Sequence, residues 1–196
     1  MTDIKIFSDF ACPFCYIGFS IVDRLRKENP DINIIWFPYE LDPDLSLKGD
    51  DLTNHIPQEQ INMSYRRIER LGSEYGLVYN NKTKKFNTNR LHKAALYAIK
   101  EDKYYEFAKE AFKTIFELGK NVGEPAIVNE IGLSVGLNIV EMNNCIDNGS
   151  FDEKMEETRS LIPVYGVESV PTFIVDDKKK VELLKDYEKF KNDLLG

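Results

Sequence analysis

The sequence has few cysteines, little positive charge and no long apolar run. Three of its 196 residues are cysteine, an odd and low number that does not suggest a framework of structural disulfides. The 33 acidic side chains outnumber the 26 basic ones and give a formal net charge of −7. This balance argues against nucleic-acid binding, because phosphate contacts need a basic face. No apolar run approaches the roughly 20 residues needed to cross a bilayer.

The N-terminus also lacks a recognisable targeting segment. Residues 1–8 lead directly into a strand pattern, without the charged and then apolar stretches of a secretory signal. We therefore expect a cytoplasmic protein that binds neither nucleic acid nor membranes. In a reducing compartment, a close pair of cysteines is more often redox-active or metal-binding than structural. The sequence leaves the oligomeric state open.

The two ends of the chain have the pattern of an α/β core. Residues 3–8 alternate like a strand, apolar residues then recur at helical spacing from 17 to 25, and residues 32–37 form an apolar run. This order predicts a βαβ unit with parallel strands and a right-handed crossover. Near the C-terminus, residues 172–175 and 181–184 predict an antiparallel hairpin, which a last helix follows.

The middle of the chain has a different pattern. Between residues 45 and 165, apolar residues recur at helical spacing, which predicts a series of helices. The chain thus divides into a core, residues 1–44 plus 166–196, and an insertion domain, residues 45–165. The predicted fold class is α/β, with a βαβ…ββα core interrupted by a large all-helical insertion.

The most informative motif is Cys12-Pro13-Phe14-Cys15, at the predicted junction of a strand and a helix. Cys12 would lie at the helix N-terminus, where free N–H groups and the helix dipole stabilise a thiolate and lower its pKa. Pro13 suits the first helical turn, where a missing N–H costs nothing. Cys15 would lie one turn further and deeper, within reach of a mixed disulfide at Cys12. We expect Cys12 to be the exposed nucleophile and Cys15 the resolving thiol.

Two other interpretations of the cysteine pair are open. A structural zinc site needs four ligands, but Cys145 stands alone and His55 and His92 show no ligand spacing, so we expect no metal. The two cysteines could also pack in the core without activity, since free cysteine is often buried. The position of the pair at a strand-to-helix turn favours redox chemistry over both.

Four segments, spread over nearly the whole chain, carry a family resemblance. They are residues 9–18 around the cysteines, residues 37–41, Asn87-Thr88 followed by His92, and residues 166–173. They resemble the DsbA-like branch of the thioredoxin superfamily, and in particular its FrnE-like cytosolic oxidoreductases. The resemblance implies a thioredoxin-like core that carries a helical domain between its βαβ and ββα halves.

The resemblance also implies a site beyond the cysteines. Val170-Pro171 would be a cis peptide facing the pair, which adds Pro171 to the catalytic residues Cys12 and Cys15. The backbone of Val170 would pair with an extended substrate segment. The implied activity is thiol–disulfide exchange, with a protein or small-molecule disulfide or thiol as substrate. No cofactor is implied, although glutathione could act as a redox partner.

Pro13 and Phe14, between the cysteines, are the other expected substrate contacts. In strongly oxidising relatives a histidine at the second of these positions helps to stabilise the thiolate, whereas Phe14 has no hydrogen-bond donor. We therefore expect a couple more reducing than the roughly −120 mV of DsbA.

Other activities of the same fold are alternatives. Kappa-class glutathione transferases and 2-hydroxychromene-2-carboxylate isomerases normally have serine where Cys12 stands and lack the second cysteine. Some cytosolic DsbA-like proteins are non-enzymatic adaptors that present partners to proteases. Both cysteines of this chain count against the transferase and isomerase activities.

Polar side chains outside the motif have simpler expected roles. Glu40 could move protons for Cys15, or it could cap the surface. Asn87 or Thr88 is expected to cap a helix, and His92 to lie on a helix face without a catalytic role.

Overall fold

The computed structural model describes residues 2–182 and 187–196, and its central feature is a four-stranded mixed sheet. The strand order is β2-β1-β5-β6, in which β1 and β2 are parallel and the other neighbours antiparallel. The strands are β1 (Asp3–Ser8), β2 (Asn33–Pro38), β5 (Thr172–Val175) and β6 (Lys179–Glu182). The predicted βαβ unit and C-terminal hairpin are confirmed.

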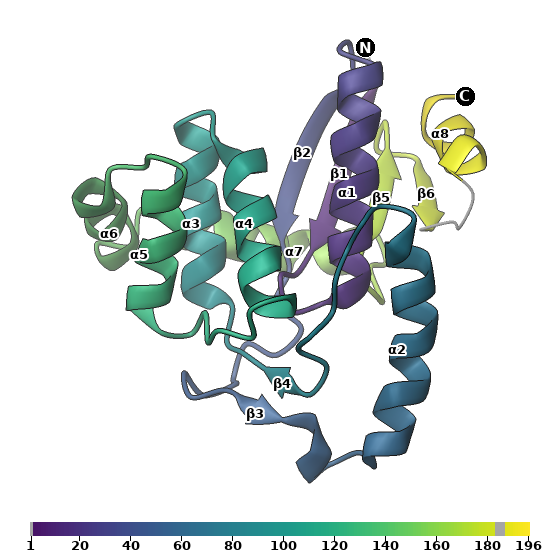
Figure 1. Ribbon diagram of the computed structural model, residues 1–196. Coiled ribbons are helices and arrows are strands. Elements are labelled where there is room, and N and C mark those ends of the chain that lie inside the picture. The colour runs from purple at the N-terminus through teal and green to yellow at the C-terminus, as the bar shows by residue number, and fades with distance from the viewer. Residues whose placement is uncertain (1, 183–186) are drawn as a thin grey trace.

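Helix α1 (Pro13–Glu28) connects the two parallel strands and crosses the sheet in Figure 1. Its apolar residues recur along one buried face, and Arg26 in its last turn suits the negative end of the helix dipole. The helix ends at Asn29, whose side chain donates to the carbonyl of Leu25 at 2.9 Å. Burying each apolar side chain of this face contributes about 2 kcal/mol.

The hairpin between β5 and β6 turns earlier than the sequence predicts. Asp176 and Asp177 have φ values of 48° and 59°, a left-handed conformation that aspartate tolerates better than most residues. The second strand therefore begins at Lys179, whereas its apolar pattern begins at Val181. Residues 183 and 184, which we expected to continue this strand, lie outside the described residues.

The insertion contains the helices that its periodicity predicts. They are α2 (Gln58–Ser73), α3 (Asn89–Lys100), α4 (Tyr104–Phe116), α5 (Pro125–Ser134), α6 (Ile139–Asp147) and α7 (Asp152–Val164). Figure 1 shows α2 to the right of α1 and α3 to α6 grouped to its left. The last helix of the chain, α8 (Tyr187–Leu195), packs Phe190 against Phe173 of β5 with ring centroids 4.9 Å apart.

The insertion also contains elements that we did not expect. Strands β3 (Asp50–Asp51) and β4 (Lys84–Lys85) form a two-stranded antiparallel sheet, and a short 3-10 helix, η1, covers Leu52–Asn54. Strands of two residues are too short to show any alternation of polar and apolar side chains, so "all-helical" was too simple a description. The domain limits at residues 44 and 166 stay a prediction.

An aromatic cluster joins helix α4 of the insertion to α1 and to the cysteine loop. Tyr16 of α1 stacks on Phe112 of α4, with ring centroids 5.1 Å apart and planes within 9°, and Phe10 lies 5.0 Å from the same ring. Such pairs add about 0.5–1.5 kcal/mol beyond the burial of their area. Phe10, before the cysteines, and Tyr16, after them, therefore both anchor the cysteine loop on α4. Across residues 2–182 and 187–196, none of the helices is both long and apolar enough to span a membrane.

Candidate active site

The turn between β1 and α1 places Cys12 at the start of the helix. Cys12 is the N-cap of α1, with extended backbone angles (φ −94°, ψ 118°), and Pro13 is the first helical residue. The Cys12 N–H donates to the carbonyl of Asp9 at 3.2 Å, and the Cys15 N–H donates to the carbonyl of Cys12 at 3.0 Å. The first N–H groups of α1 and its dipole therefore face the Cys12 sulfur.

The two cysteines differ in depth, as expected. Both are free thiols, and Cys15 is 1% exposed whereas Cys12 is 7% exposed. Cys12 is thus the more accessible sulfur, but it is less exposed than the sequence suggested. Burial, and to a smaller extent the charges of Cys12 and Glu69, raises the pKa of Tyr65 on α2 to about 12.

The environment shifts the two thiol pKa values in opposite directions. The pKa of Cys12 lies below its ordinary value, chiefly because the Cys15 side chain hydrogen-bonds to the Cys12 thiolate. The backbone N–H groups of Cys15 and Phe14 also donate to it. Together these hydrogen bonds outweigh burial and the charge of Asp9, which raise the pKa. The pKa of Cys15 is raised well above the ordinary value, first by burial and then by its proximity to Cys12. The pair thus has one thiol prepared to attack and one held protonated.

Alkylation should reveal this asymmetry. In the reduced protein, iodoacetamide should modify Cys12 with an apparent pKa below 9.0, the ordinary thiol value, and leave Cys15 unmodified until the protein is denatured. Rates measured over a pH series, with the modified cysteine identified by peptide mass mapping, check this. Equal labelling of both residues in the native protein would contradict the assignment of nucleophile and buried partner.

Val170 and Pro171 lie opposite Cys12, as the sequence resemblance implied. The Cys12 thiol donates to the Val170 carbonyl at 3.4 Å, and the Val170–Pro171 peptide bond is cis. Gly18 of α1 permits this approach, because a Cβ there would lie 3.1 Å from Cγ of Pro171. A larger residue at this position would push the proline away from the cysteines.

The two residues between the cysteines are held by the insertion. The carbonyl of Pro13 accepts a hydrogen bond from the Tyr79 hydroxyl at 3.1 Å. The Phe14 ring is half-buried, and the guanidinium of Arg67 lies 5.9 Å from its centroid. Arg67 is exposed, so it brings a permanent positive charge to the rim of the site, where it favours thiolates and anionic substrates.

Asp9 forms a buried polar cluster directly behind the cysteine loop. It is 1% exposed; its Oδ1 accepts from the Thr88 hydroxyl at 2.8 Å and pairs with Nε2 of His92 at 3.1 Å. The backbone N–H groups of Ala11 (3.1 Å) and Leu41 (2.8 Å) also donate to this carboxylate. The cluster ties the cysteine loop to α3 and to the end of β2.

The structure shows where the polar residues around the start of α3 lie. Thr88 precedes α3 but does not cap it through its side chain; the Asn87 side chain instead accepts from the Asn89 N–H at 3.0 Å. His92 lies on α3, where it is 3% exposed and bonded to Asp9; the expectation that it has no catalytic role stays a prediction. A charged residue directly after the first strand pattern and before Phe10 is the signal that could have identified Asp9.

Glu40 is engaged away from the thiols. Its carboxylate accepts from the Asn89 side chain at 2.9 Å and pairs with Arg159 at 2.9 Å. These bonds join the end of β2 to α3 and α7. The geometry therefore favours a structural role for Glu40 over proton transfer at Cys15.

Comparisons with known proteins agree with this geometry. A curated relative, the uncharacterized protein YwbO of Bacillus subtilis, is 25% identical over 176 residues, which is 89% of this chain and 86% of that protein. The crystal structure of the probable DsbA oxidoreductase SCO1869 from Streptomyces coelicolor superposes with a TM-score of 0.88 at 18% identity, covering 99% of this chain and 88% of that one. The cytosolic disulfide reductase DsbM from Pseudomonas aeruginosa, in its structure with GSH, gives 0.74 at 14% identity, covering 97% and 96%.

At these identities the two solved structures show a common fold only. The family model, in contrast, shows which family the chain belongs to. The model of the DSBA-like thioredoxin domain matches residues 3–194, from the first strand to the last helix. The matched span contains both cysteines, the insertion and the cis proline. This chain belongs to the DSBA-like thioredoxin domain family.

Proposed function

We propose that this protein is a thiol–disulfide oxidoreductase that works through a mixed disulfide at Cys12. The observation that carries the proposal is the pairing of an activated, more accessible thiol at a helix N-terminus with a buried thiol one turn away. The Cys12 thiolate attacks a substrate disulfide, forms one new S–S bond and releases one substrate thiolate. Cys15 then attacks the Cys12 sulfur, closes the internal disulfide and releases the second thiolate. Two electrons pass to the substrate, and the reverse sequence oxidises a dithiol.

The surroundings of Cys12 suggest how a substrate would bind. The Val170 backbone beside the sulfur could pair with an extended segment that carries the reacting cysteine. Phe14 offers an apolar surface, Pro13 lies at its edge, and Pro171 keeps other donors away from the sulfurs. The positive charge of Arg67 above Phe14 suits acidic thiols such as glutathione. The similarity to the P. aeruginosa reductase supports this substrate class and a cytoplasmic, FrnE-like assignment.

Trapping of the mixed disulfide tests the proposal. In a Cys145→Ser background, the Cys15→Ala variant should accumulate a one-to-one adduct at Cys12 when the reduced protein is mixed with oxidised glutathione, because no thiol remains to resolve it. Intact mass and peptide mapping identify the adduct. The matched Cys12→Ser variant, which retains Cys15, should form none. An adduct on Cys15 in that variant, or none on Cys12 in the first, would overturn the proposal.

A further inference from the structure

An apolar groove follows the outer edge of the central sheet. Its volume is about 520 Å³, and three consecutive residues of β2, Ile34, Ile35 and Trp36, line it together with side chains from α3, α4 and α7. Successive side chains of a strand point to opposite faces of the sheet. A groove that touches all three therefore runs along the edge of β2, with α3 and α4 on one side and α7 on the other. Its volume lies in the range of ordinary ligand sites.

The main chain of β2 presents unpaired groups to this groove. Strand β2 pairs with β1 on one edge, and no strand in the part of the chain that the structure describes pairs with the other. The Asn33 N–H donates to the Thr2 carbonyl at 3.0 Å, so the odd-numbered residues of β2 point their main-chain groups at β1. The direction alternates along a strand. The N–H and C=O groups of Ile34 and Trp36 therefore point to the free edge, which is a template for a further strand.

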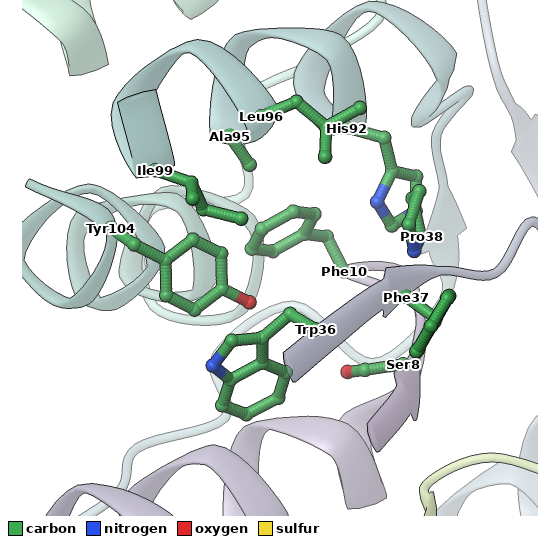
Figure 2. A pocket seen from close by; sticks show the side chains of 10 residues that line it. All are labelled: Ser8, Phe10, Trp36, Phe37, Pro38, His92, Ala95, Leu96, Ile99 and Tyr104. Atoms are coloured by element: carbon green, nitrogen blue, oxygen red, sulfur yellow. The ribbon is translucent and has the colours of Figure 1, made fainter. Parts of the chain in front are cut away.

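The side chains around this edge offer apolar and aromatic surface. Figure 2 shows Trp36 of β2 and Tyr104 of α4 next to each other, near Ile99 of α3, and the two ring centroids lie 5.1 Å apart. Ile99 is 42% exposed, and Ile34 and Ile35 are half-buried. The side chains of an added strand would alternate between the α3–α4 side and the α7 side. Covering this surface would remove apolar area from water, which favours binding.

One charge in the groove is unmatched. Lys154 pairs with Glu157 at 2.7 Å. Asp102, between α3 and α4, also lines the groove and is exposed, and it forms no ion pair with any residue that the structure describes. The whole chain has a net charge of −7. A free carboxylate beside an apolar groove selects a partner that brings a positive charge.

We propose that this groove binds an extended segment of a partner polypeptide, which adds a strand to the free edge of β2 and carries apolar side chains and a basic residue. The main chain of Ile34 and Trp36 would supply hydrogen bonds to any sequence, whereas the apolar lining and Asp102 would supply the selectivity. The inference goes beyond the proposed function, because the groove is separate from the Val170 backbone beside Cys12. A partner can be held there without occupying the nucleophile.

Fluorescence of Trp36 tests the proposal directly, because this residue lines the groove and is the one tryptophan of the chain. The probe is a blocked eight-residue peptide in which valine and threonine alternate between two terminal lysines. Titration should give a saturable change in emission. The same peptide with its internal amides N-methylated cannot donate main-chain hydrogen bonds and should bind about tenfold more weakly. A peptide with glutamates in place of the lysines should also bind more weakly.

Two variants test the two recognition elements of the groove. Asp102 has a φ of 58°, which asparagine also tolerates, so Asp102→Asn removes the charge and keeps the backbone. It should weaken binding about two- to fivefold at low salt, the effect of one exposed ion pair. Ile34→Pro removes an N–H that faces the free edge, where proline is accepted, and should weaken binding at least about tenfold. The control Asp44→Asn changes an exposed carboxylate outside the groove and should bind the peptide normally.

Several results would refute the proposal. One is a titration with the lysine peptide that gives no saturable change, and another is binding that neither groove variant weakens. Equal binding of the N-methylated peptide would show that the groove takes apolar molecules without regard to their main chain. A dimer in light scattering that Ile34→Pro dissociates would show that a second copy of the chain occupies the edge. The peptide contains no cysteine, so none of these results depends on whether the protein exchanges disulfides.

Discussion

Cys12→Ser should lower disulfide turnover by roughly three orders of magnitude, because the attacking group is a thiolate and a serine hydroxyl stays protonated at any pH at which the protein folds. Reduction of insulin, followed as turbidity with dithiothreitol as the electron donor, measures the loss. No other residue of the site compensates, since Cys15 is buried and its thiol is held protonated.

The control for this loss is Cys145→Ser, which removes the third thiol of the chain on α6 and should leave turnover unchanged. Full insulin reduction by Cys12→Ser would contradict the mechanism. Loss of insulin reduction together with conjugation of glutathione to chlorodinitrobenzene by the unsubstituted protein would indicate the transferase alternative. A protein without either activity, but with partners bound through the insertion, would fit the adaptor alternative.

Asp9→Ala should destabilise the protein by at least about 3 kcal/mol, because each buried donor left without its acceptor costs about 1–3 kcal/mol and this substitution leaves several. The substitution leaves the His92 ring, the Thr88 hydroxyl and two backbone N–H groups without their acceptor, and unmade hydrogen bonds of this kind are costly. Urea unfolding monitored by circular dichroism gives the difference in free energy. Asp50→Ala is the matched control: it removes the carboxylate of the exposed pair with His55 and should change the free energy of unfolding little.

Acid should reproduce part of this effect in the unsubstituted protein. Burial alone would raise the pKa of Asp9, but the hydrogen bond and charge of His92 and the backbone N–H groups of Leu41 and Ala11 bring it below the ordinary 3.8. A carboxyl group with a depressed folded-state pKa stabilises the fold above its unfolded value, and this contribution is lost as the pH falls through the lower folded value. Stability should therefore fall on acidification below about 3.8, and Asp9→Ala should lack this part of the loss. A parallel pH dependence in both proteins would contradict the prediction.

Local patterns predicted most of the fold. The βαβ unit, the C-terminal hairpin and the series of helices between residues 45 and 165 all follow from the sequence, and helices such as α2 (Gln58–Ser73) and α4 (Tyr104–Phe116) lie in that range. These elements are long enough for their apolar periodicity to be visible. The two-residue strands β3 and β4 are not, and the early start of β6 at Lys179 depends on a turn whose aspartates adopt a left-handed backbone.

The sequence predicted only those parts of the candidate site whose residues lie close together in the chain. Cys12 and Cys15 are three residues apart, and the helix N-terminus that activates Cys12 follows directly from the strand-to-helix turn. Asp9 and His92 lie 83 residues apart, and only the folded chain brings them together. Periodicity places His92 on a helix but does not show which helix face meets the cysteine loop. Packing of α3 and α4 against that loop decides it.

The stack of Tyr16 on Phe112 determines how the protein can be re-engineered. The helix that activates Cys12 and the helical domain share one aromatic core, in which Phe10, Phe19 and Phe116 also take part. The insertion therefore cannot be exchanged on its own. A relative's helical domain grafted onto this core would leave the space behind the cysteine loop unfilled. A chimera that is to gain a new substrate range must carry both faces of this aromatic contact, so natural variation in the two halves should be coupled at these positions.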